Sequence, residues 1–334
     1  MKKLYALGDC HFSTSRDWDR EVFNNFLNWF EKLDFGPKED CELIQLGDVT
    51  ERSSNLGDTL ELMTKFFKIC CDKFHKIYLV GGNHDHKNIH NKSQFSTQFL
   101  KYLGNIETIY QERLFHTDNG FHVMALPYRR VEGKVLDDYY SNELPEEFYK
   151  TSVDLFCGHV ALKEPKTFYG GITASHFKKP KAKAFGHIHT RNGIYKDAYI
   201  GSISSFKIDE KNTELPRVIR CLTKNEKCII QEDLEIPVFI EYETLQFGEH
   251  PKRNKTNKTQ IFTITNCKNI QQAKTQYPNL YIRGIEKIKN DINVRANEKS
   301  EHFITPLHAL ENMITETKIV IKRKTLSLLK TILS

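Results

Sequence analysis

The chain has 334 residues, of which 39% are hydrophobic and 28% are charged. This composition supplies enough apolar side chains for a folded core and excludes a wholly disordered or collagen-like chain. No run approaches the roughly 18 apolar residues of a membrane span, and the first apolar run is stopped by Asp9, unlike a secretion signal. We therefore expect a cytoplasmic protein without membrane attachment, whose eight cysteines are reduced thiols.

The net charge of +6 is unevenly distributed. Residues 251–334 contain 16 Lys+Arg and 6 Asp+Glu, a net charge of +10, which leaves −4 on the rest of the chain. The basic part indicates a surface that faces a polyanion or a partner, and a solubilising lysine-rich tail is the alternative.

Strands and helices alternate at the start of the chain. Short apolar runs predict buried strands at residues 3–7, 41–46 and 76–80, and apolar residues at helical spacing predict helices at 19–33 and 59–74. This alternation is typical of an α/β fold with right-handed crossovers.

The pattern changes further along the chain. Shorter strands are expected at 121–126, 153–157 and 183–185, and then two antiparallel strands between 217 and 239. A basic, Asn-rich stretch at 252–258 marks a boundary. A small α/β module is expected after it, followed by a helical pattern; the elements are strand 260–265, helix 270–276, strand 280–285 and helix 306–333.

Five polar clusters follow directly on predicted strands. They are Gly8-Asp9-Cys10-His11, Gly47-Asp48, Gly82-Asn83-His84-Asp85, Gly158-His159 and Gly186-His187-Ile188-His189. Ligands of α/β sheets bind at the carboxyl ends of the strands, and the leading glycines let the backbone approach a metal or phosphate closely. Oxygen and nitrogen donors without cysteine suit Mn²⁺, Fe or Zn²⁺. Two metals clamp a phosphate and activate water, and the two oxygens of Asp48 suit a bridge between them.

In its five motifs and their order, the sequence resembles the calcineurin-like metallophosphoesterases. Within that superfamily it looks most like the SbcD-type DNA double-strand-break repair nucleases, especially their compact phage versions. Ala125-Leu126-Pro127-Tyr128 and Tyr199-Ile200-Gly201-Ser202 resemble two further segments of those nucleases. The resemblance implies an α/β fold of the four-layer α-β-β-α sandwich type. It also implies three parts: a nuclease domain at 1–240, a capping and DNA-binding domain at 250–300, and a helical tail at 305–334.

The resemblance also implies roles for the motif residues. One metal would be held by Asp9, His11, Asp48 and His189, and the other by Asp48, Asn83, His159 and His187. His84 would be the catalytic proton donor, and Asp85 would orient it. The two divalent ions would be Mn²⁺, with Mg²⁺, Fe or Zn²⁺ as alternatives.

The implied function is DNA exonuclease and endonuclease activity in repair and recombination. The implied partners are DNA and an SbcC-like ATPase of the SMC family, with a homodimer inside a heterotetramer. The dimer helices would lie at about 58–74 and 93–103. Residues 319–330, with an apolar stripe and a basic face, would dock on the coiled coil of the ATPase, and a membrane-surface helix is the alternative.

Lys179, Lys181 and Lys183 precede the His187 motif and are candidates for contact with the DNA backbone, with a solvated loop as the alternative. Arg52 departs from the SbcD pattern and is more like the Ser/Thr protein phosphatases. A small-molecule phosphodiesterase or a Ser/Thr protein phosphatase therefore stays open as a second function. A non-enzymatic scaffold is a third.

Overall fold

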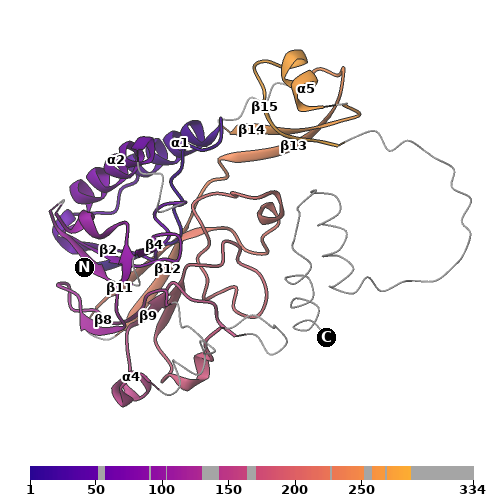
Figure 1. Cartoon of the computed structure of the whole chain (residues 1–334). Coiled ribbons are helices and arrows are strands. Elements are labelled where there is room, and N and C mark those ends of the chain that lie inside the picture. The colour runs from indigo at the N-terminus through magenta and orange to yellow at the C-terminus, as the bar shows by residue number, and fades with distance from the viewer. Residues whose placement is uncertain are drawn as a thin grey trace, which may run out of the picture. The chain divides into compact units, whose positions relative to one another are not determined.

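The computed structural model describes residues 1–51, 57–89, 92–102, 104–129, 143–163, 171–225, 228–251, 258–267 and 269–286 (Figure 1). Residues 1–288 form one compact unit. Arg52, the expected tail at 305–334 and its docking segment lie outside the described residues.

The largest sheet has six strands in the order β12-β11-β1-β2-β3-β6. These strands are β1 (Lys2–Leu7), β2 (Cys41–Gln45), β3 (Lys76–Val80), β6 (Ile106–Ile109), β11 (Val218–Lys224) and β12 (Ile229–Glu235). The strands β1, β2, β3 and β6 are parallel to one another, whereas β11 is antiparallel to both β1 and β12. Helices α1 (Asp19–Lys32) and α2 (Gly57–Lys73) connect the first three strands, as the sequence predicts.

A second sheet has four strands in the order β10-β9-β8-β7. These are β7 (Arg113–His116), β8 (His122–Leu126), β9 (Leu155–Gly158) and β10 (Ala182–Phe185). The strands β8, β9 and β10 are parallel, so their carboxyl ends meet at one edge.

The six-stranded sheet is covered on both faces. Helices α1 and α2 lie on one face of it (Figure 1). Phe23 and Phe66 of these helices belong to the apolar core on that face, and Ile44 and Val123 belong to the core between the two sheets. The outer face of the four-stranded sheet packs against Phe148 of α4 (Glu146–Lys150) and against loop residues. Within the part of the chain that the structure describes, this outer cover is one short helix with loops and not a helical layer. The protein therefore has a mixed α/β fold with several sheets.

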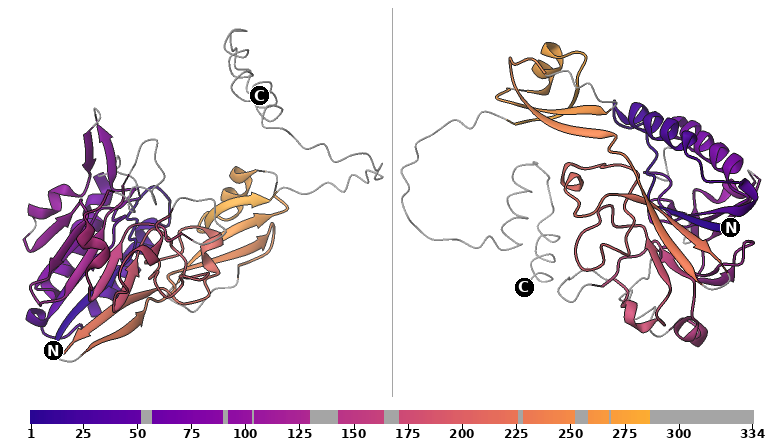
Figure 2. Two further views of the ribbon diagram at one scale, coloured as in Figure 1. Left: turned by 90° about the horizontal axis from the view of Figure 1, so that it is seen from below. Right: turned by 180° about the vertical axis from the view of Figure 1, so that it is seen from behind.

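A small module follows β12. Its sheet has the order β13-β14-β15 with parallel neighbours, and its elements are β13 (Ile240–Gln246), β14 (Thr259–Thr265), α5 (Ile270–Gln276) and β15 (Tyr281–Glu286). The hydroxyl groups of Thr259 and Tyr281 each donate a hydrogen bond of 2.9 Å to Glu21 of α1, beside which the module lies (Figure 2). The two strands and the helix predicted here are confirmed. The module also contains a strand that was not predicted as part of it, β13, which lies before residue 250. The division into domains stays a prediction.

The predicted helix at 93–103 is wrong. This segment contains β5 (Lys92–Phe95), which pairs with β4 (His86–Ile89), and a 3-10 helix, η2 (Gln98–Tyr102). The ring of Phe95 stacks on Tyr110 at 4.2 Å between centroids. Tertiary packing of this aromatic side chain favours the hairpin over the helix that the resemblance implied.

None of the helices in the described ranges is long and apolar enough to cross a membrane.

Candidate metal centre

The five motifs converge at one edge of the two sheets. They follow β1, β2 and β3 of the first sheet and β9 and β10 of the second, in each case at the carboxyl end of the strand. Asp9, His11, Asp48 and His159 are almost wholly buried there. Polar side chains of this kind are buried only where they are paired or bind an ion, so the edge is a functional candidate.

Three residues of the motifs have a strained backbone. His11, Asp48 and His187 have φ angles of 49°, 47° and 73°, in the left-handed region that non-glycine residues rarely adopt. Strain of this kind persists only where the surroundings hold it and clusters at functional sites.

The loop that carries Gly82 also lies so close to Asp48 that no side chain would fit at position 82. A Cβ atom added to Gly82 would lie 2.1 Å from the backbone nitrogen of Asp48 and 2.2 Å from its Oδ1. Glycine at this position therefore lets the third motif pack directly against Asp48.

His11 and His189 form one half of the centre. Their Nε2 atoms lie 2.9 Å apart, and Nε2 of His11 lies 3.6 Å from Oδ2 of Asp48. The structure thus brings together three of the four residues expected at the first metal.

Asn83, His159 and His187 form the other half. Oδ1 of Asn83 lies 2.8 Å from Nε2 of His159 and 2.9 Å from Nδ1 of His187. Nε2 of His159 also lies 3.2 Å from Oδ2 of Asp48. Asp48 therefore lies between the two halves, where a bridging carboxylate is expected.

Asp9 lies beside His159. Its Oδ1 is 3.2 Å from Nδ1 of His159, and both of its oxygens accept hydrogen bonds of 3.0 Å from the backbone nitrogen of His187. All seven expected ligands thus belong to one connected cluster, in which Asp9 lies close to Asp48 and also contacts His159.

The orientations of these two rings fit a metal. Nδ1 of His189 lies 2.9 Å from Glu210, and because a carboxylate only accepts, this nitrogen donates the hydrogen bond. Nδ1 of His11 lies 2.9 Å from Glu51 without forming a hydrogen bond. The two Nε2 atoms lie 2.9 Å apart, and a divalent metal beside them would take a lone pair from each ring.

The charges of the cluster are consistent with this. Burial would raise the pKa of Asp9 and of Asp48, but His159 holds both pKa values below their usual range. Burial would lower the pKa of His159, yet the two aspartates raise it well above its usual value. Two buried carboxylates therefore need positive charge, which a proton on His159 or a bound metal supplies.

His84 lies half-buried at the border of this cluster. Its ring meets that of His11 edge-on at 4.8 Å, and its backbone nitrogen donates to Oδ1 of Asp48 at 2.8 Å. Its Nδ1 lies 2.5 Å from the main-chain oxygen of Glu51. The partner that orients the His84 ring is thus Glu51.

The role expected for Asp85 is corrected by this geometry. Its buried carboxylate accepts hydrogen bonds from the backbone nitrogens of Val49 and Thr50, at 3.2 and 3.1 Å, and from the hydroxyl of Thr50. Burial and the negative charge of Asp48 raise the pKa of Asp85 to about 6. Asp85 therefore fixes the loop that carries Asp48, not the His84 ring.

The three lysines expected at the active edge lie elsewhere. Lys179 and Lys181 precede β10, whereas His187 follows it, so they lie at the opposite end of the strand. Nζ of Lys181 is 2.8 Å from Asp154, and Lys183 lies within β10. The expectation that this run borders the active edge is wrong, because the direction of the strand separates it from the metal centre.

The sequence reading missed Glu51 and Glu210. Glu51 follows the second motif by three positions, so its nearness to Asp48 is a signal that could have been used. Glu210 lies 21 positions after His189 in a 3-10 helix, η4 (Ile208–Lys211), and carries no such signal.

Comparisons with known proteins agree with the metal centre. A family model described as calcineurin-like phosphoesterase matches residues 2–191. No curated protein matches the chain.

The solved structures that match the chain are distant from it. One is AQ665 from Aquifex aeolicus, a protein of unknown function, with 15% identity over 50% of this chain and 82% of that chain and a TM-score of 0.27. Another is the phosphopantetheinyl hydrolase PptH from Mycobacterium tuberculosis, with 16% identity over 60% of this chain and 90% of that chain and a TM-score of 0.34. Neither likeness bears on the substrate of this chain.

Proposed function

The chain belongs to the calcineurin-like phosphoesterase family, which makes it a metal-dependent hydrolase of phosphoesters, and we propose that its substrate is DNA. In this proposal it is an exonuclease and endonuclease of the SbcD type. The observation that carries the proposal is the arrangement of two segments around the metal centre, each of which resembles a segment of those nucleases.

The first segment is Ala125-Leu126-Pro127-Tyr128. The backbone nitrogen of Tyr128 donates to the main-chain oxygen of Gly81 at 2.8 Å, and that of His159 donates to Leu126 at 2.9 Å. The segment therefore joins the loops that carry His84 and His159.

The second segment is Tyr199-Ile200-Gly201-Ser202. A Cβ on Gly8 would lie 2.1 Å from the main-chain oxygen of Gly201, and the backbone nitrogen of Ser202 donates to the main-chain oxygen of His189 at 3.3 Å. This segment joins the first and last motifs. Both resembling segments thus support metal-binding loops, and the support for the nuclease is their resemblance to the SbcD-type segments.

The residues of the centre suit phosphodiester hydrolysis. Two divalent ions, Mn²⁺ in this proposal, supply charge neutralisation and an activated water when they are bound by Asp9, His11, Asp48, Asn83, His159, His187 and His189. His84 lies beside the expected ligands His11 and Asp48, with Nδ1 fixed by Glu51. It can give a proton to the leaving sugar oxygen, which is the role of a general acid.

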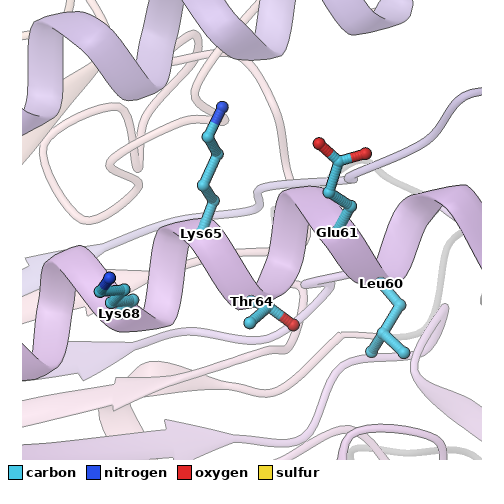
Figure 3. Close-up of a pocket in the computed structure, with 5 residues that line it drawn as sticks. All are labelled: Leu60, Glu61, Thr64, Lys65 and Lys68. Carbon is cyan, nitrogen blue, oxygen red and sulfur yellow. The ribbon is translucent and has the colours of Figure 1, made fainter.

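The partners in this proposal are an SbcC-like ATPase and a second copy of the chain. An open hollow on α2 is lined by Leu60, Glu61, Thr64, Lys65 and Lys68, with Glu61 and Lys65 on one side of the helix (Figure 3). Leu60 is 40% exposed there. This surface lies in one of the two segments expected to form the dimer.

The test is a comparison of substrates in the presence of Mn²⁺. Purified protein is incubated with linear duplex DNA, circular single-stranded DNA, bis-p-nitrophenyl phosphate and a phosphopeptide. We expect shortening of the linear DNA and nicking of the circle, and Asp48→Asn as a matched control should abolish both. Turnover of the phosphopeptide or of the small phosphodiester without DNA cleavage would overturn the proposal and favour the alternative function.

A further inference from the structure

The two histidines His11 and His189 are each backed by a glutamate that is not an expected metal ligand. We propose that Glu51 and Glu210 are positioning residues that act on the same metal position, by holding the Nε2 atoms of these histidines toward it. The proposal rests on the metal centre and not on the DNA substrate.

The side chain of Glu210 is held in place by hydrogen bonds at both carboxylate oxygens. Its side chain is 9% exposed, and its Oε1 lies 2.9 Å from Nδ1 of His189. Its Oε2 accepts hydrogen bonds from the backbone nitrogens of Phe206 and Lys207, at 2.8 and 3.3 Å. The carboxylate is therefore fixed at both oxygens, and it can hold the ring of His189 in one orientation and one tautomer.

The main chain of Glu210 is anchored as well. The guanidinium of Arg217 donates to its main-chain oxygen at 2.6 Å. The hydroxyl of Tyr242, in the small module, donates to the main-chain oxygen of Ser205 at 3.0 Å in the same loop. The position of Glu210 thus depends on packing from two other parts of the unit.

Glu51 has a weaker contact with His11 from the other side. Its carboxylate lies 2.9 Å from Nδ1 of His11 without forming a hydrogen bond, and its backbone nitrogen donates to the main-chain oxygen of Phe12 at 3.1 Å. Its side chain is 32% exposed, so water can replace part of its contact. We therefore expect Glu51 to matter less than Glu210.

The other half of the centre has a different support. Nδ1 of His159 lies 2.7 Å from the main-chain oxygen of Leu46, with the expected ligand Asp9 next at 3.2 Å. In the described residues, neither Glu51 nor Glu210 has a hydrogen bond or ion pair with His159 or His187. Loss of either glutamate should therefore weaken one metal position and leave the other intact.

The experiment measures Mn²⁺ binding to the full chain, with free Mn²⁺ counted by electron paramagnetic resonance. The wild type should bind two ions. In Glu210→Gln we expect one affinity to be unchanged and the other to fall about 10- to 100-fold. Glu51→Gln should give a smaller loss at the same position, and Glu214→Gln, an exposed glutamate paired with Lys196, should change neither affinity.

A purely structural role is separated from a positioning role by two further readouts. Glu210→Asp keeps the charge and should regain part of the lost affinity. Long-range proton–nitrogen NMR of the Zn²⁺-loaded wild type should show Nδ1 protonated on both His11 and His189. Unchanged Mn²⁺ affinities in a folded Glu210→Gln, or protonation at Nε2, would overturn the proposal. If Glu210→Gln does not fold, Glu51→Gln and the NMR measurement decide it. DNA cleavage is not measured, so failure of the nuclease proposal leaves this test unchanged.

Discussion

The main-chain oxygen of Glu51 lies 2.5 Å from Nδ1 of His84. A carbonyl oxygen only accepts a hydrogen bond, so Nδ1 of His84 carries a proton and Nε2 is the nitrogen that can exchange one. The carboxylate of the same Glu51 backs His11. One residue thus couples the orientation of the expected proton donor to that of an expected metal ligand.

His84→Ala should separate proton donation from metal binding. We expect Mn²⁺ binding to persist, because the seven expected ligands are retained, and hydrolysis to fall about 100- to 10,000-fold through loss of the general acid. The measurement is the single-turnover rate at saturating Mn²⁺, with bound Mn²⁺ counted in the same sample. His75→Ala is the control, since His75 precedes β3 and is 43% exposed at the opposite end of that strand. An unchanged rate in a folded His84→Ala protein would remove His84 from the mechanism.

The expected ligands could be found from the sequence because each follows a strand directly. Parallel strands carry such residues to one edge, so Asp9, Asp48 and His159 meet whatever the details of the loops. The packing between loops could not be found in this way. Asp85 stands next to His84 in the chain, yet its carboxylate bonds to the backbone of Val49 and Thr50.

Two other errors have the same physical origin. The charge of Lys181 indicated a polyanion contact, but strand direction places it at the far end of β10, where Asp154 binds it. The resemblance to the SbcD-type nucleases implied a helix at 93–103, but Phe95 stacks on Tyr110 and lies in a hairpin. In both cases a contact between separate parts of the chain decides the structure.

Removal of the metal should destabilise the protein. Asp9, Asp48 and Asp85 are almost wholly buried together, and their mutual repulsion is relieved by a cation. Mn²⁺ at 100 times its Kd should add about 2.7 kcal/mol to the free energy of unfolding. Thermal unfolding with EDTA and with excess Mn²⁺ measures this. In Asp48→Asn, Mn²⁺ should stabilise the protein only slightly. Equal stabilisation by Mn²⁺ in wild type and variant would mean that Mn²⁺ binds elsewhere.

Gly82→Ala should disrupt the centre without removing any ligand. The new Cβ would lie 2.1 Å from the backbone nitrogen of Asp48, so Asp48 or its loop must move. We expect loss of bound Mn²⁺ and a cost of roughly 1–3 kcal/mol in stability. Gly284→Ala is the matched control, because its Cβ would meet nothing within 4 Å. Wild-type Mn²⁺ content in Gly82→Ala would show that this close approach is not needed.

Asp154 should make the stability of the fold depend on pH at a place remote from the metal centre. Its carboxylate is buried beside the amino-terminal ends of β9 and β10 and is bound by Lys181 and Lys224, at 2.8 and 2.9 Å, and by the backbone nitrogen of His122. Burial would raise the pKa of Asp154, but these partners lower it to about 2.

The direction of the pH effect follows from this pKa. An unfolded aspartate titrates near pH 3.9, so between about pH 4 and pH 2 the unfolded chain binds more protons at this residue than the folded chain. The stabilisation by Asp154 is therefore complete above about pH 5 and is lost as the pH falls toward 2. Its size is roughly 1–2 kcal/mol, less than the full shift would give because the Lys181 side chain is 56% exposed to solvent screening.

Urea unfolding of the metal-free protein between pH 3 and pH 7 measures this effect. Asp154→Asn should lower the free energy of unfolding at pH 7 and flatten its dependence on pH below 5, because a neutral amide cannot titrate. Asp209→Asn, which changes an exposed aspartate, should leave the profile as in the wild type. Parallel profiles for wild type and Asp154→Asn below pH 5 would show that the acid sensitivity lies in other carboxylates and that the two lysine contacts contribute nothing measurable.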